Sequence, residues 1–335
     1  MPRLAICLLF VIAAFLALGG FQLLKTASGR AQPASPSKPA RDAFAADRAP
    51  ATASAISFDG QRAMGYLEAI CKIGPRISGT DGMKQQQELV KKHFEARGAK
   101  VDLQRFSGRQ LSQKQPIEMA NLIASWYPER PRRVILCSHY DTRPIADQEP
   151  ERRHWTQPFI SANDGGSGVA LLMELAHHLG ELKTEVGIDC VLFDGEEYIF
   201  EPKRDKYFFG SEHFAQVYRR DRPKQRYVAA VLLDMIAGKN ARFPVEQHSA
   251  MNAGALVQEL WSIAAELKCA AFVDRFGSAV QDDHLALNQA GIPAVDIIDF
   301  SYPHWHRLTD VADNCSVESM QQVARVLTVW LERVK

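Results

Sequence analysis

Apolar runs alternate with segments of helical spacing along most of this chain, and five short polar motifs follow apolar stretches. The apolar runs have the composition of buried or half-buried strands. They occupy residues 100–106, 119–126, 133–138, 188–193, 227–233 and 294–298. Helical spacing is found at residues 60–71, 81–97, 168–179, 211–218, 253–267, 283–290 and 317–334. This alternation predicts an α/β domain with a mostly parallel (mixed) central sheet and helices on both faces.

The five polar motifs combine histidines with carboxylates. They are His139-Tyr140-Asp141, Asn163-Asp164-Gly165, Asp194-Gly195-Glu196-Glu197, Leu233-Asp234-Met235 and Trp305-His306. In open α/β sheets, ligands bind at the carboxyl ends of the strands, where these motifs are expected to meet. Histidine nitrogens and carboxylate oxygens are the ligands of catalytic zinc, so the motifs predict a carboxylate-rich zinc site.

Composition excludes some classes of function. The 335 residues are 46% hydrophobic and 24% charged, with a formal net charge of only +1. These values are typical of a globular protein, and a nearly neutral balance without a basic stripe argues against binding of nucleic acid.

Five cysteines follow residue 55 without a CxxC spacing, so we do not expect them to bind zinc. The formation of one disulfide between two of them is left as an open alternative.

The N-terminal part of the chain has a different character from the rest. Residues 4–24 carry no charge and are flanked by Arg3 and Lys25, as in an export segment. A spanning helix needs about 20 apolar residues, so residues 1–25 are interpreted as a signal-anchor or a cleaved signal peptide. Residues 26–55 are rich in Ala, Pro and Ser and predict a disordered linker. Residues 56–335 would then form one catalytic domain, exported and either membrane-anchored or secreted.

Individual roles follow from the order of the polar groups. His139 is a candidate ligand with Asp141 as its orienting carboxylate, or the two only fix a loop. Asp164 is the first-choice ligand, with capping of the following helix as the alternative. Of the adjacent glutamates, we assign Glu197 to the metal and Glu196 to general acid/base catalysis.

A second group of side chains is expected to support the first. Asp234 and Asp282 are candidates for an acid cluster with Glu196, in which the titrations are coupled. One of Asp282 and Asp283 is expected to cap a helix instead. His306 would be the remaining ligand, and Trp305 and Tyr302 would form an apolar wall for a substrate side chain.

These residues resemble the zinc aminopeptidase superfamily and, within it, the glutaminyl cyclases. The resemblance runs from about residue 60 to the C-terminus. It rests on the five motifs together with Phe209-Gly210-Ser211, Gln281-Asp282-Asp283-His284 and Gly291-Ile292-Pro293. The Gln-Asp-Asp-His block and the Trp-His pair favour the cyclases over plain aminopeptidases.

The resemblance implies a specific reaction and site. The reaction is cyclisation of N-terminal glutamine in peptides or proteins to pyroglutamate, with release of ammonia. One zinc ion would be held by Asp164, Glu197 and His306, with Glu196 as the acid/base. Asp234 and Asp282 would be hydrogen-bonded partners of Glu196. Gln281, Tyr302 and Trp305 would form the pocket for the glutamine.

Two other readings remain open. A two-zinc aminopeptidase would use His139 and Asp234 for a second ion and Glu196 to activate water. A membrane-tethered binding module with a decayed site is less favoured, because every ligand position still carries a residue that binds metal.

Overall fold

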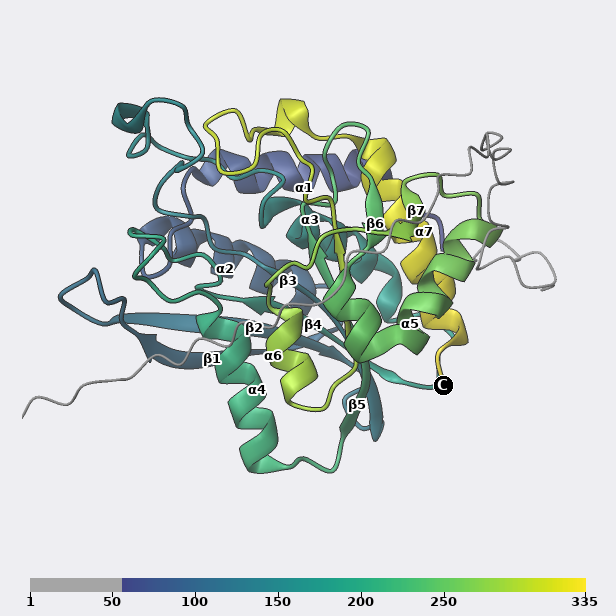
Figure 1. Ribbon diagram of the computed structural model, residues 1–335. Coiled ribbons are helices and arrows are strands. Elements are labelled where there is room, and N and C mark those ends of the chain that lie inside the picture. Colours follow the sequence, from purple (N-terminus) through teal and green to yellow (C-terminus); the bar gives the residue numbers. More distant parts are fainter. Residues whose placement is uncertain (1–55) are drawn as a thin grey trace, which may run out of the picture. The chain divides into compact units, whose positions relative to one another are not determined.

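The structure, a computed structural model, describes residues 56–335 (Figure 1). The expected export segment and linker, residues 1–25 and 26–55, lie outside the described residues. Within residues 56–335, no helix combines the length and apolar character needed to cross a membrane.

A six-stranded mixed sheet forms the centre of the described part, in the order β1-β2-β4-β3-β5-β8. The strands are β1 (Lys100–Gly108), β2 (Ile117–Trp126), β3 (Arg132–His139), β4 (Gly187–Phe193), β5 (Arg226–Asp234) and β8 (Ala294–Ile298). β1 and β2 are antiparallel, and β2 is antiparallel to β4. β4, β3, β5 and β8 run parallel to one another, so their carboxyl ends lie at one edge. The predicted mixed sheet is confirmed.

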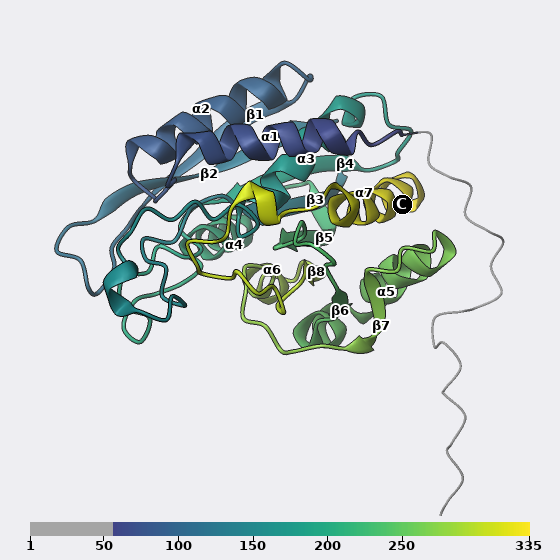
Figure 2. The ribbon, with the colours of Figure 1, turned by 90° about the horizontal axis from the view of Figure 1, so that it is seen from above.

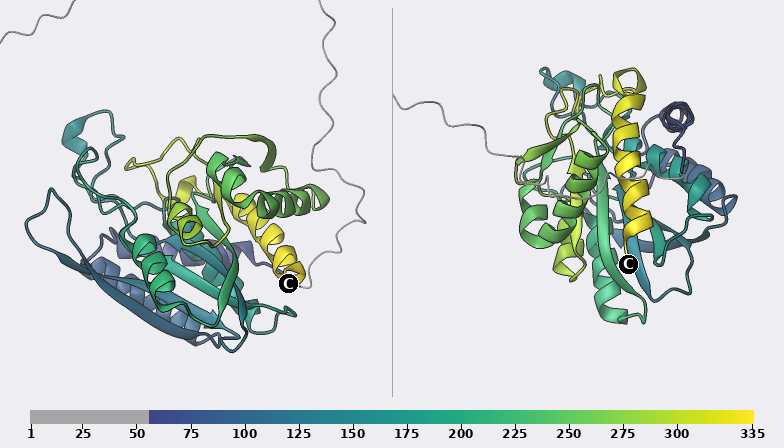
Figure 3. Two further views of the ribbon diagram at one scale, coloured as in Figure 1. Left: turned by 60° about the horizontal axis from the view of Figure 1, so that its bottom comes forward. Right: turned by 90° about the vertical axis from the view of Figure 1, so that its right-hand side faces the viewer.

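Helices cover both faces of the sheet, as predicted (Figure 2). The helices are α1 (Gly60–Ile73), α2 (Asp81–Glu95), α3 (Gly166–Leu179), α4 (Phe209–Asp221), α5 (Gln247–Glu266), α6 (His284–Gln289) and α7 (Val317–Arg333). The larger apolar core joins one sheet face to α1, α2, α3 and α7. A smaller core joins the other face to α4 and α6. α5 lies beside α7 and β8 (Figure 3).

The sequence pattern missed a small two-stranded sheet, formed by β6 (Phe243–Val245) and β7 (Phe272–Phe276). β6 has only three residues and contains Pro244, which is atypical of a strand. The sequence pattern also placed the start of α5 at residue 253, which is six residues after its actual start at Gln247. Glu246 caps α5 by accepting from the backbone N–H groups of His248 and Ser249. The pattern conceals this start because glutamate is not among the usual capping residues.

Close packing of α3 on the sheet brings Asp164 to the strand ends. Gly165 is the N-cap of α3 with φ +75°, and a Cβ there would lie 2.7 Å from Cε1 of His139. At Gly168 a Cβ would lie 2.5 Å from the carbonyl oxygen of Leu233 in β5. Only glycine allows these approaches. Asp164 therefore precedes the helix without capping it, and its carboxylate is available to the site.

Two short 3-10 helices, Arg152–His154 and Ala312–Asn314, complete the regular structure. All five cysteines of the described part are free. Cys137 and Cys190 are fully buried within β3 and β4, where each packs as a small core residue.

Candidate active site

The five polar motifs meet at the carboxyl edge of the parallel strands. His139 ends β3, Asp234 ends β5, and the two glutamates follow β4. A cavity of about 250 Å³ opens at this edge. Its wall is formed by Arg143, Asp164, Glu196, Glu197, Tyr207, Phe208, Asp234, Ala279, Val280, Gln281, Asp282, Ile298, Phe300, Trp305 and His306.

One buried group of possible ligands consists of Asp164, Glu197 and His306. Nε2 of His306 lies 3.2 Å from Oε2 of Glu197 and 3.5 Å from Oδ2 of Asp164. Two ligands of a tetrahedral zinc ion, each about 2.1 Å from it, lie about 3.4 Å apart. The spacing of these three side chains therefore fits a zinc ion.

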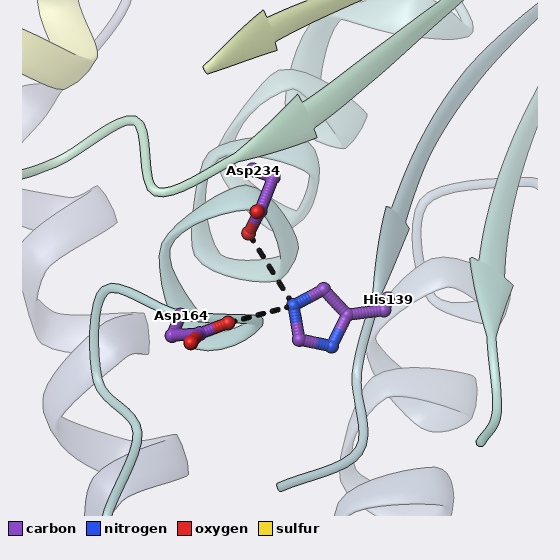
Figure 4. Close-up of side chains that lie close together, drawn as sticks. All are labelled: His139, Asp164 and Asp234. Atoms are coloured by element: carbon purple, nitrogen blue, oxygen red, sulfur yellow. Dashed lines mark hydrogen bonds and ion pairs between the residues drawn. The ribbon is translucent and has the colours of Figure 1, made fainter. Parts of the chain in front are cut away.

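A second group shares Asp164 with the first (Figure 4). Nε2 of His139 lies 3.0 Å from Oδ1 of Asp164 and 3.3 Å from Oδ1 of Asp234. Asp164 thus directs one oxygen to each histidine. This geometry also fits a metal ion, so two neighbouring positions are available.

Unsatisfied polar atoms support this interpretation. Oδ2 of Asp164, Oε2 of Glu197 and Oδ1 of Asp234 are buried without hydrogen-bond partners in the described part of the chain. Buried carboxylate oxygens normally have a partner, and leaving one without a partner is costly. Cations bound between these oxygens and the two histidines would satisfy all three.

Backbone and side-chain contacts fix the ligands from behind. Asp310 accepts hydrogen bonds from the backbone N–H groups of Asn163 and Asp164, at 2.9 and 3.1 Å. Glu197 accepts at Oε1 from the backbone of Arg143, at 2.9 Å, which leaves Oε2 facing the cavity. These bonds hold the carboxylates before any ion binds.

Asp141 differs from its expected role. Its Oδ1 is 3.6 Å from Nδ1 of His139, too long for a hydrogen bond. Its two oxygens instead accept from the backbone N–H groups of Glu196 and Glu197, at 3.1 and 3.2 Å. Asp141 therefore positions the glutamate pair more directly than it positions the histidine.

Asp147 is a site residue that the sequence pattern did not reveal. Its Oδ1 lies 2.9 Å from Nδ1 of His306, and the same carboxylate accepts from the buried guanidinium of Arg143. Burial alone would raise the pKa of Asp147, but His306 and Arg143 lower it to about 2. An ionised Asp147 thus orients His306 with Nε2 toward the metal position. Asp147 stands by itself in the loop after β3 and belongs to none of the five polar motifs, so no pattern singles it out.

Replacing Asp147 by Asn is expected to weaken zinc binding roughly 10- to 100-fold, the usual effect of losing a group that orients a histidine ligand. Competition with a chromogenic chelator measures this affinity. Asp221→Asn is the matched control, because Asp221 is exposed at the end of α4 and, among the described residues, its carboxylate pairs with Arg220 alone. Equal affinities for the two variants would contradict the orienting role.

Two acidic residues of the cavity wall have raised pKa values. Burial, and next the charges of Asp282 and Glu197, raise the pKa of Glu196 well above its ordinary value, against the opposing effect of His139. The pKa of Asp282 is likewise raised well above normal by burial and by Asp234. Oδ2 of Asp282 has no hydrogen-bond partner within residues 56–335. Glu196, Asp234 and Asp282, the predicted acid cluster, all line the cavity. Negative charge on one of these carboxyls disfavours ionisation of the others.

The helix-capping role expected for one of Asp282 and Asp283 is wrong for Asp283. This residue is at the N-cap position of α6, but its side chain makes no capping bond. Asp282 accepts at Oδ1 from the backbone N–H of Asp283, its neighbour in the sequence, at 2.6 Å.

The predicted substrate-binding residues separate into two places. Trp305 and Gln281 line the cavity, whereas Tyr302 does not. Tyr302 is buried and donates its hydroxyl to Oδ1 of Asp310, at 2.8 Å. The structure thus places it behind the ligands. Tyr207, Phe208 and Phe300, which the sequence pattern did not single out, supply further aromatic wall.

Comparison with known proteins agrees with this fold. The model of peptidase family M28 matches residues 121–331. The chain therefore belongs to peptidase family M28.

Solved structures place the chain more narrowly. A glutaminyl cyclase from Fimbriiglobus ruber is 50% identical, with a TM-score of 0.83, and the match covers 87% of this chain and all of that one. Within the M28 family, the chain accordingly groups with the glutaminyl cyclases. A leucine aminopeptidase precursor from Bacteroides thetaiotaomicron is 28% identical, with a TM-score of 0.78. That match covers 85% of this chain and all of the precursor structure.

A curated relative is more distant. The glutaminyl-peptide cyclotransferase of Bos taurus is 23% identical over an aligned length of 247 residues, and the match covers 63% of this chain. The match spans 65% of the length of the bovine protein, slightly under two thirds.

Proposed function

We propose that this protein cyclises N-terminal glutamine of peptides to pyroglutamate and releases ammonia. The observation that carries the proposal is the position of Glu196. It lies in the wall of the same cavity as Asp164, Glu197 and His306, yet it belongs to neither possible ligand group. The 50% identity to a glutaminyl cyclase supports the choice of reaction.

In this proposal Asp164, Glu197 and His306 hold one zinc ion. When bound, zinc supplies Lewis-acid polarisation of a carbonyl group. Glu196 takes a proton from the α-amine of the substrate as that nitrogen attacks the side-chain carbonyl carbon. Glu196 then returns the proton to the leaving nitrogen as the carbon–nitrogen bond of the side-chain amide breaks. Its raised pKa suits a group that must both accept and donate.

Trp305 and the neighbouring aromatic residues shape the cavity around the reacting atoms. The indole of Trp305 lies 4.1 Å from the ring of His306, centroid to centroid, and so packs against the metal position. With Phe208 and Phe300 it narrows the cavity and limits water beside the reacting atoms. Exposed Gln281 at the rim offers an amide to the substrate backbone.

Paired assays on the full-length protein test the function. We expect ammonia from a glutaminyl peptide and no free amino acid from an alanyl or leucyl peptide of the same length. Release of free amino acids without ammonia would sink the proposal and favour an aminopeptidase.

The two-zinc aminopeptidase remains a second candidate because of one observation. His139, Asp164 and Asp234 form a second ligand group beside the first, complete and buried. Metal analysis of the purified protein separates the candidates. One zinc per chain favours the cyclase, in which His139 and Asp234 belong to the scaffold and proton network, and two favour the peptidase.

Zinc affinity is expected to rise as the pH increases. Burial lowers the pKa of His306, but Asp147 and Glu197 raise it to about 9. The imidazole must lose its proton to bind metal, so each unit of pH below that value should weaken binding about tenfold. Chelator competition at several pH values measures the slope. An affinity independent of pH would contradict the protonated state of His306.

We further propose that residues 1–25 direct export and that residues 56–335 are the catalytic domain joined to them by residues 26–55. The uncharged run at residues 4–24 supports this assignment. Cell fractionation tests it: recovery with membranes indicates an anchor, recovery in the exported soluble fraction a cleaved signal, and recovery in the cytoplasm contradicts export.

A further inference from the structure

A second cavity lies beside the active-site cavity and shares part of its wall. It has a volume of about 290 Å³. Val280, Ile298 and Phe300 line both cavities. The remaining wall of the second cavity comes from β6 and the residues on either side of it, from β7, and from the segments that follow β7 and β8. The two cavities are therefore neighbours across one row of apolar side chains.

The first cavity is too small for more than the start of a peptide. Its volume is below the roughly 300–1,000 Å³ of pockets that enclose a drug-sized ligand. A peptide bound by its N-terminal residue must therefore continue outside it. The second cavity offers one continuation, across Phe300.

The loop between the cavities is held in place by hydrogen bonds. The backbone N–H of Val280 donates to Oε1 of Glu246, at 2.9 Å. Gly277 donates to the carbonyl of Val245, and Gln247 donates to that of Ser278. The loop thus has a defined conformation before a ligand binds, which lowers the entropy cost of binding.

The accessible charge of the second cavity is positive. Arg275 and Arg242 are exposed in its wall, whereas Glu246 and Asp299 are buried. Both oxygens of Glu246 accept backbone hydrogen bonds, and Asp299 accepts from Ser301. Arg242 already donates to the carbonyl of Ala270. The guanidinium of Arg275 makes no such bond within the described residues, so it is available to a ligand.

Exposed aromatic rings accompany this charge. Phe276 is 72% exposed and Phe300 46%, and both line the second cavity. The ring of Phe300 also lies 5.1 Å from that of Trp305, which connects the aromatic surface of the two cavities. Large apolar side chains exposed beside a cavity are typical of a binding groove.

We propose that the second cavity binds the residues downstream of the glutamine in a peptide substrate, and that Arg275 selects an acidic side chain there. This inference rests on the proposed function. An extended peptide advances about 3.3 Å per residue, so the third or fourth residue is the first to pass well beyond the shared wall. The preferred substrates are thus glutaminyl peptides with Asp or Glu at one of these positions.

The test compares cyclisation of glutamine anilide with that of tetrapeptide amides that begin with Gln-Ala. The peptides carry Glu, Ala or Lys at the third or the fourth position. Wild-type protein should prefer Glu over Lys in kcat/KM by about two- to fivefold, the range of an exposed ion pair. Arg275→Ala should remove the preference and Arg275→Glu should reverse it, while turnover of the anilide stays unchanged.

Arg219→Glu is the matched control, since Arg219 is exposed near the C-terminal end of α4 and changes the net charge equally. It should keep the wild-type preference. Normal turnover of the anilide with no charge preference, or the same change in both arginine variants, would overturn the inference alone. No cyclisation of any substrate by wild-type protein would overturn the proposed function as well.

Discussion

Replacing Glu196 by Gln should lower kcat for cyclisation by about 10²- to 10⁴-fold, the usual contribution of a general acid/base. Glutamine keeps the shape of the side chain but cannot carry the proton from the α-amine to the leaving nitrogen. Glu196 lies outside both ligand groups, so zinc content should stay at the wild-type value. Ammonia release and metal analysis on the same preparation measure both quantities.

A nearby glutamate provides the control for this variant. Glu201 follows in the same loop and is exposed, and within residues 56–335 its one ion pair is with Arg204. Glu201→Gln should therefore leave kcat within about twofold of wild type, as surface substitutions do. If Glu196→Gln retained wild-type activity, or lost activity only because it lost zinc, Glu196 would not be the acid/base.

Replacing Asp164 by Asn should have the second large effect, because Asp164 is shared by both ligand groups. An amide oxygen is a weaker and neutral ligand for zinc. We expect zinc affinity to fall by more than about 100-fold and cyclisation to fall with it. Zinc raises the thermal stability of a protein that binds it only when folded, so the wild-type melting temperature should drop on chelation. The variant should show no such drop.

The melting curves also separate lost binding from lost folding. Asn has nearly the same volume as Asp and sits in the same cavity wall, so the variant should melt near the chelated wild-type protein. Asp102→Asn on the exposed face of β1 is the control and should keep the response to zinc. If the melting temperature of Asp164→Asn still fell on chelation as in wild type, Asp164 would not be a zinc ligand.

Much of the fold follows from local patterns in the sequence. Residues 134–137 of the sequence, Val-Ile-Leu-Cys, are an unbroken apolar run, and β3 is accordingly buried on both faces in the middle of the sheet. Parallel strands bring their carboxyl ends together, so the meeting of Asp164, Glu196 and Glu197 could be predicted once the strands were assigned. The short strand β6 could not, because three residues with a proline carry too weak a pattern.

Other parts of the site depend on contacts between distant loops. Asp147 and His306 are 159 residues apart, as are Glu149 and Leu308 beside them, and nothing local indicates that these loops meet. Tyr302, by contrast, is close to the Trp305-His306 motif in the sequence but does not line the cavity. Its place beside Trp305 and His306 predicted a wall residue, but the tight turn between them directs its hydroxyl to Asp310. Motif proximity along the chain thus indicates a shared loop without fixing the direction of each side chain.

The most direct measurement is the fate of solvent oxygen during turnover of a glutaminyl peptide. The zinc-loaded protein is incubated with the peptide in water enriched in the heavy oxygen isotope, and the product is analysed by mass spectrometry. Cyclisation uses the α-amine as the nucleophile, so we predict a product lighter by one ammonia and free of label. A labelled product, with the first residue released or the side-chain amide converted to an acid, would contradict intramolecular cyclisation.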